Sequence, residues 1–330
     1  MRIDRTIWIR YKFLMYQRST LLSRQAENIF WMARYLERAE NLLRLMDITQ
    51  VFSPGSVNEQ NWQSILQIHE DEEAFYASYK ALNGANVIRF YLTDETNPNS
   101  VMSCIQQARH NASTLRSIIS TEMWVQTNVL YNYLRSITLD DFESQDFSEL
   151  FSRLRRRCQA HTGITEGTFY RDQSWYFYLL GKQLERGDQV TRLLDIKYHL
   201  LLPSLEDVGS SFDTLQWFAL LRAAGGYHAF RRETPHVLNP STVAGFLLHA
   251  RRFPRSLASC LLNTKESFYA LIRDYNLQAA EEGYEISGDL IHQLEKRPVE
   301  DIIAQGLHEF LDQMQLGIIF VTNTCIKMFR

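Results

Sequence analysis

One row of side chains near the start of the chain has types and spacing that could hold an anionic ligand. The row contains an acid, an indole and two arginines, namely Glu27, Trp31, Arg34 and Arg38. Residues three or four positions apart lie on one face of an α-helix. A guanidinium group offers a fork of donors to a carboxylate or phosphate, and an indole can stack on a guanidinium or a planar ligand. The row is therefore a candidate binding site for a carboxylate or another anion.

The same row has a structural interpretation, in which Glu27 and both arginines pair with neighbouring helices. At positions 148 residues later the basic side chains are kept and the acid is lost, since that row reads Trp175, Leu179, Lys182, Arg186 and Gln189. A ligand site on this face would therefore be asymmetric, and the row that begins at Glu27 is the better candidate.

Two stretches of the chain, 148 residues apart, have nearly the same sequence. Tyr35–Ile48 reads YLERAENLLRLMDI, and Gln183–Ile196 reads QLERGDQVTRLLDI. Their charged residues are predicted to form a structural polar network. Its members are Glu37, Glu40, Arg44, Asp47, Glu185, Arg186, Asp188, Arg192 and Asp195. Within it, helical spacing predicts that Arg44 pairs with both Glu40 and Asp47.

Further matches extend the repeat beyond the first motif. Asn97-Pro98 has a counterpart in Asn239-Pro240, and Trp62 has one in Trp217. The sequence therefore predicts an all-α, internally duplicated multi-helix bundle with two pseudo-equivalent halves. Repeat one covers about 21–160 and repeat two about 165–330. Residues 1–20 precede the pattern and are expected to be a disordered extension or a mis-called start.

Helical periodicity, together with capping and helix-breaking residues, predicts where the helices begin and end. Ser23 is a good N-cap, and Ser53-Pro54-Gly55 stops the first long helix near residue 52. The second long helix is predicted over about 173–202. Shorter helices are expected over about 62–82, 98–119, 122–137, 148–160, 212–231, 241–262, 263–280 and 300–328. No alternating strand pattern is present.

Two carboxylates near helix ends are candidate catalytic bases. Glu122 opens a predicted helix, and Glu166 precedes the second long helix. Their ordinary role at such positions is to complement the helix dipole. In the alternative, they converge on one cavity with Arg171 and Arg255 as ligand-binding residues. Arg255 follows Pro254, where a predicted kink would free a backbone carbonyl for another partner.

Several chemistries have no support in the residues. No Walker motif, GxGxxG loop or HExxH occurs, so no nucleotide or metal site is predicted in this chain. The net charge of −3 gives no argument for binding nucleic acid or an anionic membrane. No apolar run is long enough to cross a bilayer. The four cysteines are far apart, which favours free thiols and a cytoplasmic location.

The chain resembles the bacterial alpha-E domain family in several motifs that occur in order. They are LSRQAEN at 22–28, WMARYLERAEN at 31–41, STEMW at 120–124, GITEGT at 163–168 and FPRS at 253–256. The resemblance spans about 21–328 and implies an all-helical, duplicated fold. It also implies partnership with circularly permuted ATP-grasp ligases, and in some cases with transglutaminase-like peptidases. ATP and Mg are then expected on the partner ligase, with no cofactor in this chain.

Three functional hypotheses remain open. The leading one is a helical accessory or substrate-binding partner of an ATP-grasp-type amide or peptide ligase, which binds a carboxylate through Arg34 and Arg38. The second is a stand-alone acyl-transfer or hydrolytic enzyme, with Glu122 or Glu166 as its base in a deep pocket. The third is a non-catalytic interaction scaffold, in which changes at Arg38 and Arg186 affect stability alone.

Overall fold

The structure, a computed structural model, describes residues 21–51, 58–138, 147–200, 211–234 and 238–329. Every regular element in these ranges is helical, and they contain no strand, so the all-α prediction is confirmed. The predicted extension at 1–20 lies outside the described residues. None of the helices in the described part of the chain has the length and apolar content needed to cross a membrane. Cys104, Cys158, Cys260 and Cys325 are all free and buried.

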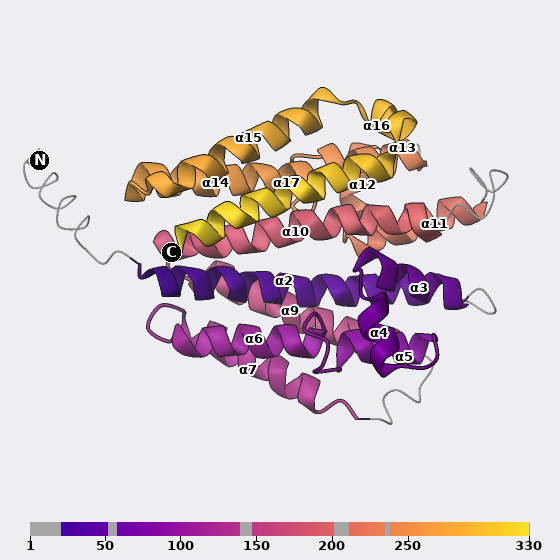
Figure 1. The fold of residues 1–330 in the computed structure, drawn as a ribbon, viewed down its shortest axis with the longest axis horizontal. Coiled ribbons are helices and arrows are strands. Elements are labelled where there is room, and N and C mark those ends of the chain that lie inside the picture. Colours follow the sequence, from indigo (N-terminus) through magenta and orange to yellow (C-terminus); the bar gives the residue numbers. More distant parts are fainter. Residues whose placement is uncertain (1–20, 52–57, 139–146, 201–210, 235–237, 330) are drawn as a thin grey trace, which may run out of the picture.

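Helices of very different lengths follow one another along the chain (Figure 1). The N-terminal part contains α2 (Ser23–Val51), α3 (Asn58–Ile68), α4 (Glu72–Ser78), α5 (Gly84–Leu92), α6 (Val101–Thr114), α7 (Thr121–Arg135) and α9 (Ser148–Thr168). The C-terminal part contains α10 (Gln173–Leu200), α11 (Ser211–Ala223), α12 (Tyr227–Glu233), α13 (Pro240–His249), α14 (Leu257–Tyr275), α15 (Glu281–Lys296), α16 (Val299–Gln305) and α17 (Leu307–Met328).

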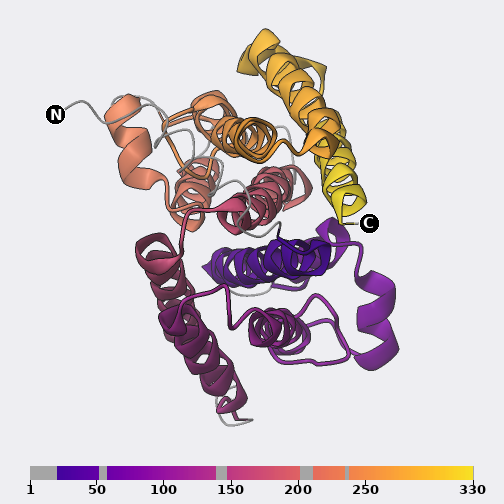
Figure 2. The ribbon, with the colours of Figure 1, turned by 90° about the vertical axis from the view of Figure 1, so that its left-hand side faces the viewer.

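The two long helices α2 and α10 lie side by side at the centre and run in the same direction (Figures 1 and 2). Close approach of their backbones requires a glycine. A Cβ added to Gly181 on α10 would lie 2.2 Å from the carbonyl oxygen of Phe30 on α2. Only glycine can bring the helices this close, because it has no side chain to hold them apart.

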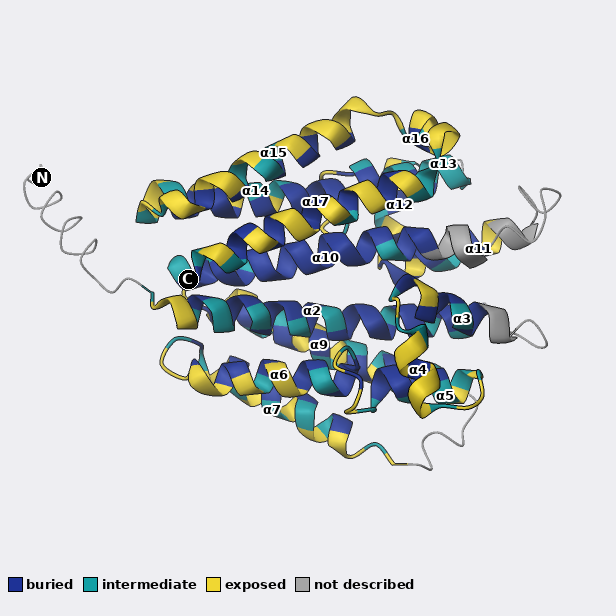
Figure 3. Ribbon diagram, viewed as in Figure 1, coloured by how far each residue is buried: buried dark blue, intermediate teal, exposed yellow. Residues whose placement is uncertain are grey.

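Each long helix is covered by helices from its own part of the chain. The helices α6 and α9 pack on α2, with α7 outside them, whereas α14 and α17 pack on α10, with α15 outside. Two short helices cross over, since α3 also contacts α10 and α11 contacts α2. Figure 3 shows buried residues following α2 and α10 along most of their described length, and exposed residues on the outer helices. The described core is therefore continuous across both parts of the chain.

Several predicted helices are divided at residues with positive φ. Glu70 has a φ of 57° and separates α3 from α4 within the predicted helix at 62–82. Gly306 has a φ of 119° and separates α16 from α17 within 300–328. The helices predicted at 241–262 and 263–280 were wrong in their boundaries, because Ser256 caps a new helix at Leu257. The predicted helix at 148–160 continues to Thr168 as α9.

Candidate functional site

Two glutamates at the centre of the molecule each accept hydrogen bonds from an arginine on the other long helix. Glu37 on α2 accepts from Nε and Nη2 of Arg186 on α10, both at 2.8 Å. Glu185 on α10 accepts from Nε and Nη2 of Arg38 on α2, at 2.6 and 3.1 Å. The glutamate of each Glu-Arg dipeptide thus bonds to the arginine of the dipeptide on the other long helix. These two interactions are called the crossed Glu–Arg pairs below.

Burial makes the crossed Glu–Arg pairs electrostatically strong. The side chains of Glu37 and Glu185 are only 3% and 0% exposed. Burial alone would raise the pKa of each carboxyl group. The guanidinium of Arg186 at Glu37, and that of Arg38 at Glu185, act against burial and hold each pKa below its usual range. In return, the charge of Glu185 raises the pKa of Arg38.

A second matching pair of interactions follows further along each long helix. Arg44 donates to Glu40 at 2.6 and 3.1 Å, and to the carbonyl oxygen of the last residue of α11 at 2.8 Å. Arg192 donates to Asp188 at 2.8 Å, and to the carbonyl oxygen of the last residue of α3 at 2.5 Å. Each arginine therefore ties its own helix to a short helix from the other part of the chain. The predicted Glu40–Arg44 pair is confirmed.

Arg255 joins this network as well. It donates to Glu37 at 2.9 Å, to Asn41 at 3.0 Å and to Glu40 at 2.7 Å. It lies in the turn between α13 and α14, so the predicted helix kink at Pro254 was wrong. The carbonyl oxygen of Pro254 nevertheless accepts a long bond of 3.4 Å from Arg186.

Arg34 and Arg38 direct their guanidinium groups to an internal carboxylate. Arg34 donates to Glu185 at 2.9 Å and to Thr322 on α17 at 3.0 Å. Arg38 also donates to Asn99 at 3.1 Å, and the two arginine side chains are 10% and 22% exposed. This arrangement matches the structural interpretation of the row, because Glu185 occupies the place expected for an external anion.

The other half of that row lies at the surface. Glu27, Trp31 and Tyr35 line a shallow groove of about 220 Å³ between α2 and α6. The guanidinium of Arg34 lies 5.3 Å from the centre of the Trp31 ring, which is within cation–π range. The groove could accept a small polar group, but the charged ends of Arg34 and Arg38 are bonded elsewhere.

The candidate catalytic acids lie near exposed helix ends. Glu122 is exposed in the first turn of α7. Glu166 is 44% exposed near the end of α9, where it accepts from Lys182 at 3.2 Å and lies 3.9 Å from Arg171. Arg171 is 65% exposed and lies over the Trp175 ring. Neither Glu122 nor Glu166 lines the cavities described in this section or below.

The last acid of each repeated motif turns to a different partner. Asp47 lies 2.6 Å from Arg155 on α9, so the predicted Arg44–Asp47 pair was wrong. Asp195 accepts from Nδ1 of His308 on α17 at 2.8 Å. With Asp312, these two residues place one ligand atom each within 4.8 Å of one another, a set that could hold a divalent cation.

Two contributors to the network escaped prediction because their partners are distant in the chain. Asn99 accepts from Arg38 across 61 positions, and Arg155 reaches Asp47 from another helix. Local spacing predicts only pairs within one helix. The available signal was the recurrence of the Glu-Arg dipeptide, which marked Glu37 and Glu185 as shared without naming their partners.

Fold and site together define an all-helical protein organised around paired Glu-Arg dipeptides on two central helices. A family model for the Alpha-E domain, described as a predicted alpha-helical domain with a conserved ER motif, matches residues 21–325. The chain belongs to the Alpha-E family, as its motifs predicted. The crossed Glu–Arg pairs give this motif a physical meaning, since each glutamate and each arginine of the two dipeptides is bonded.

Curated relatives of similar sequence are mycobacterial. The chain is 24% identical over 319 residues to Uncharacterized protein Rv2567 of Mycobacterium tuberculosis, and equally to Uncharacterized protein Mb2597 of Mycobacterium bovis. Each match covers 89% of this chain and 35% of the relative, so the chain spans about a third of the relatives' length. No solved structure matches.

Proposed function

We propose that this chain is a non-catalytic, cytoplasmic helical partner of an ATP-grasp-type amide or peptide ligase, and that ATP and Mg bind to the ligase. The observation that carries the proposal is an exposed apolar face on α17. Leu316, Ile319 and Phe320 are 57%, 47% and 61% exposed at a spacing that places them together. Exposed apolar clusters of this kind mark protein–protein contacts.

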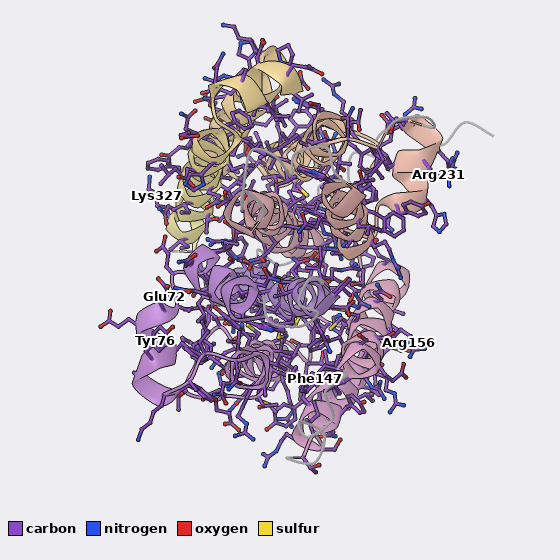
Figure 4. All side chains as sticks on the ribbon, turned by 90° about the vertical axis from the view of Figure 1, so that its right-hand side faces the viewer. Glu72, Tyr76, Phe147, Arg156, Arg231 and Lys327 are labelled. Atoms are coloured by element: carbon purple, nitrogen blue, oxygen red, sulfur yellow. The ribbon has the colours of Figure 1, made fainter. Side chains whose placement is uncertain are left out.

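The corresponding face of α9 supports a special role for this patch. The buried residues of α9 and α17 follow one pattern at an offset of 160, so Arg156, Gln159 and Ala160 correspond to the three exposed apolar residues. Arg156 points outward from α9, and Lys327 points outward near the end of α17 (Figure 4). Because this face is polar on α9 and apolar on α17, it suits a partner protein that binds at α17 and not at α9.

The length of the relatives also supports partnership. In those proteins, the region that matches this chain is joined to other sequence of nearly twice its length. Fusion of a helical region to a longer protein favours a role exercised together with another domain. The alternative of a stand-alone hydrolase requires Glu122 or Glu166 in a deep pocket, and it is weakened by the exposure of both side chains near helix ends.

We also propose that the two parts of the chain arose by duplication. The pairing extends from the long helices, at an offset of 148, to the helices that follow, at offsets of 156 and 160. Ser100 and Ser256 cap α6 and α14 in the same way, and Asn83 and Asn239 cap α5 and α13. At this offset the counterpart of Asn239 is Asn83, whereas the sequence motif alone suggested Asn97. The crossed Glu–Arg pairs fit a duplication because they join equivalent residues of the two long helices.

Co-purification with a permuted ATP-grasp ligase tests the proposed function. We expect the wild-type chain to co-purify with the ligase and to change its ATP turnover. The double variant Leu316→Asp/Phe320→Asp should stay folded and lose both effects. The matched control is Val125→Asp/Val129→Asp, an exposed apolar pair with the same spacing on α7. Equal binding by both double variants would refute the α17 face, and the appearance of a wild-type dimer that only the α17 variant loses would assign the face to self-association instead.

A further inference from the structure

A small cavity beside the crossed Glu–Arg pairs is lined by four arginines. It has a volume of about 30 Å³ and lies between α2, α10, the end of α11 and the turn before α14. Its polar wall is formed by Asn41, Arg44, Arg186, Arg192 and Arg255, with Ala224 on the apolar side. A cavity of this size has room for about two water-sized groups. It is called the arginine cavity below.

The arginines of this cavity have more donors than internal acceptors. Each guanidinium carries five N–H groups. The bonds that these four arginines make to described residues use at most three on any one of them. Donors therefore remain for a guest in the cavity.

The local charge is also unbalanced. Among the described residues, the four guanidinium groups bond to three carboxylates, those of Glu37, Glu40 and Asp188. The nearby carboxylate of Glu185 is already bonded to Arg34 and Arg38. One positive charge is therefore in excess in a buried region, where uncompensated charge is costly. Burial lowers the pKa of Arg255, which agrees with a guanidinium short of negative partners.

The proposed duplication assigns different residues to the corresponding place in the first part of the chain. Ala224 follows the last residue of α11 as His69 follows the last residue of α3, and Arg255 corresponds to Asn99 at the offset of 156. The first part of the chain therefore has a half-buried imidazole where the second has a buried methyl group. It also has a neutral amide where the second has a guanidinium. The second copy has thus gained both space and positive charge at the same place.

We propose that the arginine cavity binds a small monovalent anion of the carboxylate class. A planar carboxylate group matches the forked donors of guanidinium groups, and one negative charge offsets the excess. The source could be a free small carboxylate or the terminal carboxylate of a peptide or amino acid. This site is distinct from the row of Arg34 and Arg38, and it does not depend on the α17 face.

Isothermal titration of the full chain with sodium formate, with formamide as the uncharged control, tests the proposal. We expect saturable binding of one formate and no binding of formamide at constant ionic strength. Ala224→Leu should fill the cavity, and Arg255→Asn should remove the excess charge. Each should weaken formate binding by at least about tenfold, which corresponds to about 1.4 kcal/mol. Ala160→Leu, an exposed change on α9, should bind formate as the wild type does.

Further titrations distinguish a free small carboxylate from the carboxylate at the end of a peptide or amino acid. Binding of N-acetylalanine but not its amide would identify a chain-end carboxylate, and binding of formate alone would identify a free small anion. Absence of saturable formate binding by the wild type would overturn the proposal, as would unchanged binding in folded Ala224→Leu and Arg255→Asn. If neither variant folds, the wild-type comparison of formate with formamide decides.

Discussion

At the scale of single residues, the Glu-Arg dipeptide is explained by exchange of partners between two helices. Glu37 and Glu185 are sealed from water, and each is bonded to at least two guanidinium groups. A buried carboxylate with such partners gives little net stability over an apolar pair, but removing one member leaves an uncompensated charge. The dipeptide is therefore costly to change.

Replacing one member of a crossed pair should destabilise the fold strongly. We expect Glu185→Gln to lower the free energy of unfolding by about 3–5 kcal/mol, because Arg34 and Arg38 lose their shared carboxylate. Urea unfolding checks this, and a double-mutant cycle with Arg38→Gln gives the coupling energy. Arg273→Gln removes an exposed ion pair with Asp274 and should leave the free energy of unfolding nearly unchanged. Equal costs for the buried and exposed changes would contradict the assignment.

Stability should fall in acid because of the same carboxylates. The pKa values of Glu37 and Glu185 are lower in the folded chain than their ordinary value of 4.5, and that of Glu185 is about 2. The unfolded chain therefore binds protons first as the pH drops, so this stability is complete above 4.5 and is lost progressively below it. Urea unfolding over that range should show a shallower acid loss for Glu185→Gln. An identical slope in the variant would exclude these groups as the cause.

At the scale of elements, the sequence predicted the long helices better than the turns. The first long helix was placed correctly because Ser23 and Pro54-Gly55 are local signals for the start and end of a helix. The breaks at Glu70 and Gly306 depend on backbone conformations that single residues signal weakly. The interactions of the site were likewise predictable only where they are local in sequence. The pair within one helix, Glu40–Arg44, was predicted, whereas the partners of Arg34, Arg38 and Arg255 required tertiary structure.

Close packing of α2 against α10 should depend on one glycine. Gly181→Ala would place a methyl group against the carbonyl oxygen of Phe30, and we expect a loss of about 1–3 kcal/mol from the forced separation. Gly163→Ala on α9 is the matched control, because open space surrounds that position. It should be neutral or stabilise by about 0.5–1 kcal/mol through helix propensity. Thermal unfolding of both variants gives the comparison, and a harmless Gly181→Ala would argue against close contact.

At the scale of the whole molecule, neither part of the chain is complete without the other. Each crossed Glu–Arg pair takes one residue from each part, and α3 and α11 contact the long helix of the opposite part. The described core is therefore shared between the two parts of the chain, while the features to which a function is proposed are the α17 face and the arginine cavity.

Separate expression of the two parts tests this dependence. We expect residues 21–168 and 169–329 to show no cooperative unfolding alone, because each would expose the α2–α10 interface and leave a glutamate and an arginine unpaired. Mixed together, they should recover helical circular dichroism and one cooperative transition. A native-like transition in either part alone would show that the crossed Glu–Arg pairs are not needed for folding.

The most direct test compares an altered crossed pair with an altered docking face in one assay. The measurement is ATP turnover by the partner ligase with added wild-type chain, Arg38→Gln or Leu316→Asp/Phe320→Asp, at a temperature where circular dichroism shows all three folded. The account predicts that Arg38→Gln lowers unfolding stability yet preserves the effect on the ligase, whereas the α17 variant keeps its stability and loses that effect. Loss of the effect in folded Arg38→Gln, with the α17 variant fully active, would contradict it.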